Sequence, residues 1–145
     1  MKSFEELHNA AMEAYYKAYF GKRRQELDET AIQTYYQEAF NLEKEAVLGI
    51  LNNPLYDSLR AVYCRSAANL AFEVEEYNEV EFFVAYGLLN NPSEEVRTDL
   101  RHLYLQTLKA LKKQAVATKK AAQTAKPKTT KPRKKVGKKK NVGVI

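Results

Sequence analysis

The chain has 145 residues, of which 45% are hydrophobic, so it is long enough for one modest domain with a packed core. Its formal net charge of +6 is unevenly distributed. Residues 1–108 hold 10 basic and 18 acidic side chains, a net charge of −8, whereas residues 109–145 hold 14 basic side chains and no acid, a net charge of +14. All the aromatic residues precede residue 109. We therefore expect an acidic folded body followed by a basic tail.

The composition also excludes several classes of protein. The single cysteine, Cys64, cannot form an internal disulfide, which excludes a disulfide-stapled secreted domain. Residues 1–6 carry acids where a signal peptide needs an apolar stretch, and no run is long enough to cross a bilayer. We expect a cytoplasmic or nucleoid-associated protein, or a nuclear one if the source is eukaryotic.

Apolar residues recur with the 3.6-residue period of an amphipathic helix through most of the body. This pattern predicts helices over residues 3–20, 28–51, 55–74 and 77–88, and a fifth from Ser93 to about residue 111 or beyond. Ser3 and Ser93 are the expected N-caps, and Gly21 is expected to close the first helix in a left-handed C-cap. No segment alternates with period two, so the predicted fold class is all-α without a sheet.

An internal repeat punctuates these helices. The hexapeptide Gly-Ile-Leu-Asn-Asn-Pro at 49–54 recurs as Gly-Leu-Leu-Asn-Asn-Pro at 87–92. Proline stops the preceding helix and asparagine tolerates a tight turn, so each copy predicts a helix end followed by the next helix. Repeated helix pairs stack because one pair cannot bury its own apolar face.

Residues 61–92 resemble one tetratricopeptide (TPR) repeat. Small residues lie in the first helix, the turn reads Glu-Glu-Tyr-Asn-Glu at 75–79, and Pro92 stands where the family has its closing proline. The sequence departs from the family at Glu75, where the turn usually has glycine, at Val80 and at Cys64. Residues 35–42 are more loosely similar to the second helix of such a repeat. The resemblance implies a TPR-like domain of antiparallel helix pairs over residues 1–114, with a disordered Lys-rich tail over 115–145.

The same resemblance implies a function in binding partner proteins, because peptides often lie in the concave groove of TPR domains. The positions that it places in such a partner-binding groove are Arg65, Asn69, Phe72, Arg101 and Gln106. Some family members clamp a peptide's C-terminal carboxylate with basic and amide side chains. Arg65 and Asn69 are four residues apart on one helix and fit either part of that clamp or a simple surface pair.

The residues that commonly carry catalysis or bind metals are few. His8 lies beside an apolar stripe, which favours a packed histidine, and His102 lies among residues expected to be half exposed. Cys64 follows Arg60 by four residues, which favours a lowered thiol pKa, but a lone helical cysteine is more often a small buried hydrophobe. No zinc-ligand spacing exists. We therefore predict no catalytic residue, no metal and no cofactor, and hence a non-enzymatic protein.

Five glutamates crowd the predicted turn between residues 73 and 81, at positions 73, 75, 76, 79 and 81. Paired carboxylates do acid–base work or hold a metal only in a sheltered cleft. A turn between helices is normally solvated, so a charged surface corner is the expected arrangement, and a docking site for a basic partner or for the chain's own tail is the alternative.

Residues 121–140 consist of Lys, Ala, Thr, Pro, Gln, Arg, Val and Gly, so this part of the tail cannot bury enough apolar area to offset the entropy of ordering it. Its composition is similar to the Lys/Ala/Pro tails of linker histones and bacterial histone-like proteins. Dense lysine on a flexible chain neutralises phosphates without reading bases. The predicted polyanion-binding residues are Lys126, Lys128, Lys131, Arg133, Lys134, Lys135, Lys138, Lys139 and Lys140. Residues 131–135 also match a nuclear import signal, and a merely solubilising tail is the simplest alternative.

Together these features predict a TPR-like adaptor whose body binds a partner protein and whose tail binds DNA, RNA or another polyanion. No membrane partner is expected. One alternative is a nucleic-acid-binding accessory protein that acts mainly through the tail. Another is a small regulatory subunit of an enzyme or toxin.

Overall fold

The computed structural model describes residues 2–125. This part of the chain contains five α-helices, one short 3-10 helix and no strand, which confirms the predicted all-α fold class. The elements are α1 (Phe4–Arg23), α2 (Glu29–Ile50), η1 (Pro54–Tyr56), α3 (Asp57–Glu73), α4 (Tyr77–Gly87) and α5 (Glu94–Ala125). No helix within residues 2–125 combines the length and the apolar character needed to cross a membrane.

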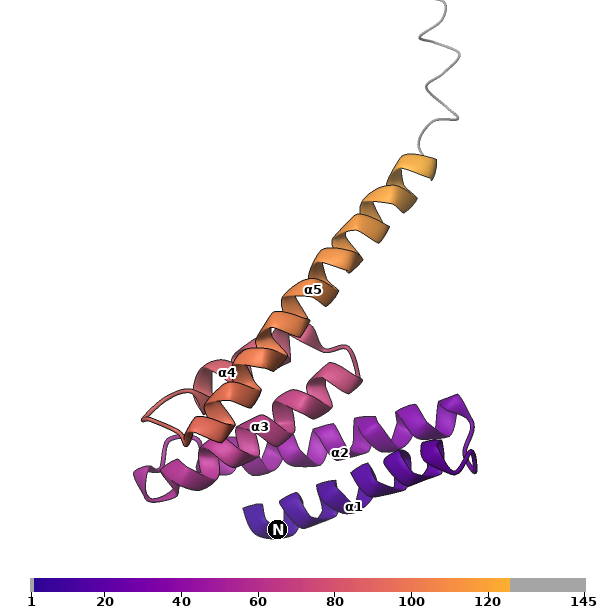
Figure 1. The fold of residues 1–145 in the computed structure, drawn as a ribbon. Helices are drawn as coiled ribbons and strands as arrows, with labels where there is room; N and C mark the ends of the chain where they lie inside the picture. Colours follow the sequence, from indigo (N-terminus) through magenta and orange to yellow (C-terminus); the bar gives the residue numbers. More distant parts are fainter. Residues whose placement is uncertain (1, 126–145) are drawn as a thin grey trace, which may run out of the picture. The chain divides into compact units, whose positions relative to one another are not determined.

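Residues up to Leu108 form one compact unit, which is built on two helical hairpins (Figure 1). α1 packs along α2, α3 packs along α4, and α2 contacts α3. Small side chains line these contacts, and the buried alanines are Ala11, Ala14, Ala18, Ala39, Ala46, Ala61, Ala67, Ala68 and Ala71. Small residues let helix backbones approach closely, so large side chains fill only the remaining gaps. Phe40 of α2 and Phe83 of α4 fill one of them edge to face, with ring centroids 6.3 Å apart.

Side-chain caps fix where the helices begin. The Ser3 hydroxyl accepts a hydrogen bond from the Glu6 N–H, and the Glu6 carboxylate accepts one from the Ser3 N–H, both at 3.2 Å. Asp28 caps α2 through a 2.8 Å hydrogen bond from a backbone N–H, and Ser93 caps α5 through one of 3.3 Å. The predicted N-caps Ser3 and Ser93 are therefore confirmed.

The prediction that Gly21 closes the first helix in a left-handed conformation is wrong. α1 continues to Arg23, and the left-handed residue is Gln25, with a φ of 57°. Gly21 is buried within the helix, where a Cβ would lie 2.3 Å from Leu27 Cδ1. Glycine is needed at this position because Leu27 packs directly against the helix backbone, and not because the backbone turns there.

The turn between α3 and α4 has the geometry of a Schellman motif. The Glu76 N–H donates to the Ala71 carbonyl at 2.9 Å, and the Glu75 N–H donates to the Phe72 carbonyl at 3.1 Å. Glu75 takes the left-handed conformation that this motif requires, with a φ of 58°. The resemblance to TPR repeats places the family's turn glycine at this same position, so the backbone here has the conformation that glycine favours even though the residue is glutamate.

The two copies of the repeated hexapeptide differ in backbone conformation. In the first copy Asn53 has a φ of −100°, and its side chain accepts a 3.1 Å hydrogen bond from the Leu55 N–H at the start of η1. In the second copy Asn90 and Asn91 both have a φ of 55°, in the left-handed region. Asparagine supports both forms because its side chain caps a helix and its backbone tolerates left-handed geometry. Both copies nevertheless end one helix and precede another, as the repeat predicts.

α5 extends past the boundary predicted after residue 114, because residues 115–125 are helical. This segment consists mainly of alanine, lysine and glutamine, which are strong helix formers, and the next proline is Pro127. The second compact unit begins earlier, at Lys109, because the helix residues beyond that point pack mainly with one another. The predicted disorder of the tail from residue 126 onward lies outside the described residues.

Replacing Glu75 by glycine should stabilise the protein. A non-glycine residue at a left-handed position costs about 1–2 kcal/mol, and glycine removes this cost. Glycine also raises the conformational entropy of the unfolded chain, which offsets part of the gain in stability. We therefore expect a net increase of about 0.5–1 kcal/mol in the free energy of unfolding. Urea unfolding followed by circular dichroism measures this change. Glu75→Gln is the matched control, because it removes the charge and keeps the strained backbone. Equal stability of the two variants would refute strain at Glu75.

Candidate peptide-binding groove

A cleft of about 280 Å³ lies between α1 and α3. Met12 and Tyr15 of α1 form one side, and the residues of α3 that line the other are Ser66, Asn69, Leu70 and Glu73. The α3 residues are three or four apart, so they share one face of that helix. The cleft therefore depends on α1 lying beside α3, two helices that are distant in the sequence.

The cleft combines apolar walls with a few polar atoms. Met12 is half-buried and Leu70 is buried. The Tyr15 ring stacks on Tyr19 with centroids 5.8 Å apart. Burial, and then the neighbouring Tyr19 and Glu73, raise the pKa of the Tyr15 hydroxyl, so Tyr15 stays neutral at physiological pH and offers a ring and a hydroxyl.

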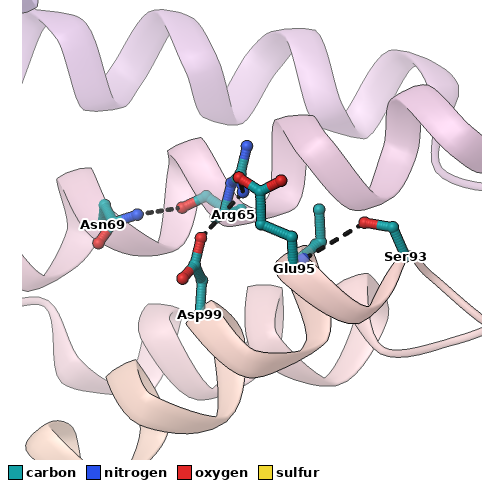
Figure 2. Close-up of polar contacts among 6 residues, drawn as sticks. Arg65, Asn69, Ser93, Glu95 and Asp99 are labelled. Carbon is teal, nitrogen blue, oxygen red and sulfur yellow. Dashed lines mark hydrogen bonds and ion pairs between the residues drawn. The ribbon is translucent and has the colours of Figure 1, made fainter.

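Two of the predicted groove residues lie together, as Figure 2 shows. Arg65 is half-buried on α3, and its Nη1 donates to Asp99 of α5 at 2.9 Å and lies 3.8 Å from a Glu95 oxygen. Asn69 is exposed one turn further along α3, and its amide nitrogen donates to the Arg65 carbonyl at 2.9 Å. The Arg65 guanidinium is thus neutralised by α5, whereas Asn69 lines the cleft.

The remaining predicted groove residues do not line the cleft. Phe72 is half-buried and packs edge to face on Tyr77, with centroids 5.6 Å apart. Arg101 and Gln106 are exposed on α5, the helix that reaches α3 through Asp99. Their proposed role in partner binding stays a prediction.

Sequence reasoning missed the α1 side of the cleft. Met12 and Tyr15 were not predicted as site residues, and Glu73 was considered only as one of five glutamates near a turn. No signal in the sequence links residues 12–15 with residues 66–73, because the link arises only when the two hairpins pack together.

A buried ionisable pair lies next to the cleft. Glu43 of α2 is fully buried, and both of its carboxylate oxygens lie 2.8–2.9 Å from Nδ1 of His8 on α1. The His8 ring stacks on Tyr63 of α3 at 4.1 Å, with an interplanar angle of 11°. The prediction of a packed histidine is confirmed. The sequence contains one indication of this buried pair, since Glu43 occupies a position in the apolar stripe of its helix.

The environment of Glu43 opposes its charge. Burial raises the pKa of the Glu43 carboxyl, and hydrogen bonds from His8 and Ser66 partly offset that rise by stabilising the carboxylate. Ser66 also lines the cleft. The buried carboxylate therefore connects α2 with α1 through His8, whose ring in turn packs on α3 through Tyr63.

The other candidates for chemistry occupy less reactive settings. Cys64 is fully buried, and burial raises the pKa of its thiol to about 12 despite the nearby Arg60 guanidinium, so it is a protonated core side chain at neutral pH. His102 is exposed. Within residues 2–125 no three His, Cys, Asp or Glu side chains lie close enough together to hold a metal ion.

The crowded glutamates near the α3–α4 turn do not form a sheltered cluster. Glu75 and Glu76 are exposed, and Glu79 forms an ion pair with Lys44 of α2, whose Nζ lies 2.5 Å from a Glu79 oxygen. This geometry matches the expected charged surface corner. Glu73 is exposed as well, and it lines the cleft.

Lysines gather on the described part of the second unit. Five exposed lysines lie on α5 beyond residue 108, namely Lys109, Lys112, Lys113, Lys119 and Lys120. At 100° per residue they fall within about 120° of arc, so they form a single face of the helix. The predicted polyanion-binding residues from Lys126 to Lys140 lie outside the described residues.

Removing the imidazole of His8 should destabilise the fold, because Glu43 would keep a buried charge without its main partner. We expect His8→Ala to lower the free energy of unfolding by about 2–4 kcal/mol at pH 7, measured by urea denaturation. His102→Ala, an exposed histidine, should change it by less than about 0.5 kcal/mol. Adding Glu43→Gln to His8→Ala should restore part of the loss. A loss unaffected by Glu43→Gln would show that ring stacking, and not the charge, explains the effect.

Comparisons of the chain with protein-family models, with curated proteins and with solved structures found no match. The resemblance to TPR repeats therefore rests on the sequence pattern of residues 61–92 and, more loosely, of residues 35–42. The site offers an open cleft with apolar side chains, a neutral tyrosine, an amide and a carboxylate.

Proposed function

We propose that this protein is a non-enzymatic adaptor. Its helical body binds a partner protein along the surface of α1 and the cleft beside α3. Its basic C-terminal part binds nucleic acid or another polyanion. The resemblance of residues 61–92 to a TPR repeat supports the first half of this proposal, and the charge of +14 after residue 108 supports the second.

The observation that carries the proposal is a row of aromatic side chains on α1 beside the cleft. Tyr15, Tyr16, Tyr19 and Phe20 contact one another, with neighbouring ring centroids 5.2–5.9 Å apart. Tyr16 is 51% exposed and Phe20 is 43% exposed. Exposed aromatic groups next to a concave surface are typical of protein interfaces, where such rings supply most of the binding energy. We name these four residues the aromatic row.

The lysine face of α5 supports the polyanion-binding half. The five lysines lie along one side of the helix in two groups, Lys109–Lys113 and Lys119–Lys120, and their positive charge on one face suits phosphate groups. This feature also favours the alternative of a nucleic-acid accessory protein, in which the basic part is the active one and the body serves folding or association.

The buried groups of the body favour binding over catalysis. Glu43 and Cys64, an ionisable side chain and the thiol of the single cysteine, both have no exposed surface. A nucleophile or general base must reach its substrate, and neither group does so in this structure.

Neutralising the basic tail should weaken nucleic-acid binding and flatten its salt dependence. In the full chain, the nine basic residues predicted to bind polyanions between Lys126 and Lys140 are replaced by glutamine. We expect the affinity for a fluorescent 20-base-pair duplex at 50 mM salt to fall about tenfold or more, because fewer lysines neutralise phosphates. The slope of log affinity against log salt concentration should also become shallower, by about 0.9 for each phosphate contact that is lost. A parallel variant replaces the five lysines of the α5 face. Unchanged affinity in both variants would exclude polyanion binding by this part of the chain.

Partner capture should depend on the aromatic row. Nuclease-treated extracts of the source cells are passed over the immobilised full chain, and the retained proteins are quantified. We expect a Tyr16→Ser, Phe20→Ser double variant to lose about 90% of a defined partner, since truncating exposed hot-spot rings costs about 1–2 kcal/mol each. Leu55→Ser is the matched control, because Leu55 is 86% exposed on η1, outside the aromatic row. Equal retention by all three proteins would contradict the proposed interface.

A further inference from the structure

We propose that the cleft between α1 and α3 binds the cationic side chain of a lysine or arginine in an extended segment of the partner protein. This inference rests on the proposed function and names the chemistry that the partner must present. It assigns the cleft the opposite charge preference from a clamp for a peptide carboxylate.

The sign of the charge in the cleft carries the argument. Glu73 is the charged residue among those that line the cleft, and no ion pair joins it to any residue in the described range 2–125. Its negative charge extends to both neighbouring tyrosines, since it contributes, after burial, to the raised pKa of the Tyr15 and Tyr36 hydroxyls. A cation that enters the cleft is attracted by this negative charge, whereas a carboxylate is repelled by it.

The cations nearest along the chain are already engaged. On α3, Arg65 donates to Asp99 at 2.9 Å. On α1, Lys17 pairs with Glu13 at 3.8 Å and lies over the Tyr35 ring, 5.7 Å from its centroid. Among the described residues, no lysine or arginine side chain lines the cleft. The carboxylate of Glu73 is thus free to accept a cation from outside.

The shape of the cleft suits a long side chain with a charged end. Met12 and Leu70 offer apolar contact for an aliphatic stem, and the Tyr15 ring offers a face for a cation. The Asn69 carbonyl oxygen accepts a hydrogen bond from an ammonium or guanidinium, because the Asn69 amide nitrogen is engaged with the Arg65 carbonyl. Lysine and arginine share these requirements, whereas an aliphatic side chain leaves Glu73 and Asn69 unused.

A titration of the full chain tests this proposal. Capped tripeptides Gly-Arg-Gly and Gly-Lys-Gly are added to ¹⁵N-labelled protein, and amide chemical shifts are followed. We expect saturable shifts at Met12, Tyr15, Ser66, Asn69 and Glu73 with a millimolar Kd. Glu73→Gln should weaken binding about fivefold. Glu76→Gln is the matched control, since it removes an equal charge from an exposed position outside the cleft, and it should leave the Kd unchanged.

Several outcomes would overturn the proposal. Equal shifts with Gly-norleucine-Gly would show an apolar occupant, and stronger shifts with Gly-Glu-Gly would show an anion site. Equal weakening by Glu73→Gln and Glu76→Gln would show general charge attraction. A tighter Kd in the variant that lacks the nine basic tail residues would show that the chain's own basic segment competes for the cleft, which would overturn the assignment to a partner.

Failure of this inference is distinguishable from failure of the proposed function. If the titration fails while the aromatic row still captures a partner, the adaptor function stands and the cation site falls. If the tripeptides bind through Glu73 but no partner is captured, the cation site stands and the adaptor function falls.

Discussion

The buried carboxylate of Glu43 is the interaction on which the arrangement of the first unit depends. A fully buried carboxylate is costly unless it is paired, and the partner of Glu43 is His8 of α1. The His8 ring also stacks on Tyr63 of α3, so Glu43, His8 and Tyr63 join three helices. The requirement for all three groups at once restricts how α1 lies beside α3, and the cleft between them follows from that placement.

Close packing of small residues makes this arrangement possible. Alanines on α1, α2 and α3 bring the backbones near enough for His8 to reach Glu43 and to stack on Tyr63. The packing leaves the Tyr16 and Phe20 rings of α1 without cover on the outer side. The same helix therefore secures the core through its alanines and presents a candidate interface through its aromatic residues.

The chain divides its charge between two parts of opposite sign. Residues 1–108 carry a net charge of −8. Arg65, on the helix that forms one side of the cleft, is paired with Asp99 within this unit. The body therefore repels polyanions and, in our proposal, accepts a cationic side chain at Glu73. The lysine face of α5 has no acid among its neighbours in the sequence, so its attraction for phosphates is not offset locally. In our proposal, a single polypeptide combines a surface for a basic segment with a surface for an acidic polymer.

Much of the local structure was predictable from the sequence, and most of the site was not. Apolar periodicity and capping chemistry predicted five helices and the starts at Ser3 and Ser93, because these signals act over a few neighbouring residues. Gly21 was misassigned because its reason, the approach of Leu27, is a contact across a turn. The two Asn-Asn-Pro turns have the same sequence but different backbone conformations, since their surroundings differ.

The sequence by itself determined the helical class, the helix starts and the division between acidic body and basic tail, all of which follow from local propensity and composition. Only the tertiary structure decided what each charged side chain does. It neutralised Arg65 with Asp99, buried Glu43 against His8, and left Glu73 in a cleft. The physical reason is that the effect of a charge depends on its neighbours in space, and for these side chains most of those neighbours lie about 35 residues away along the chain.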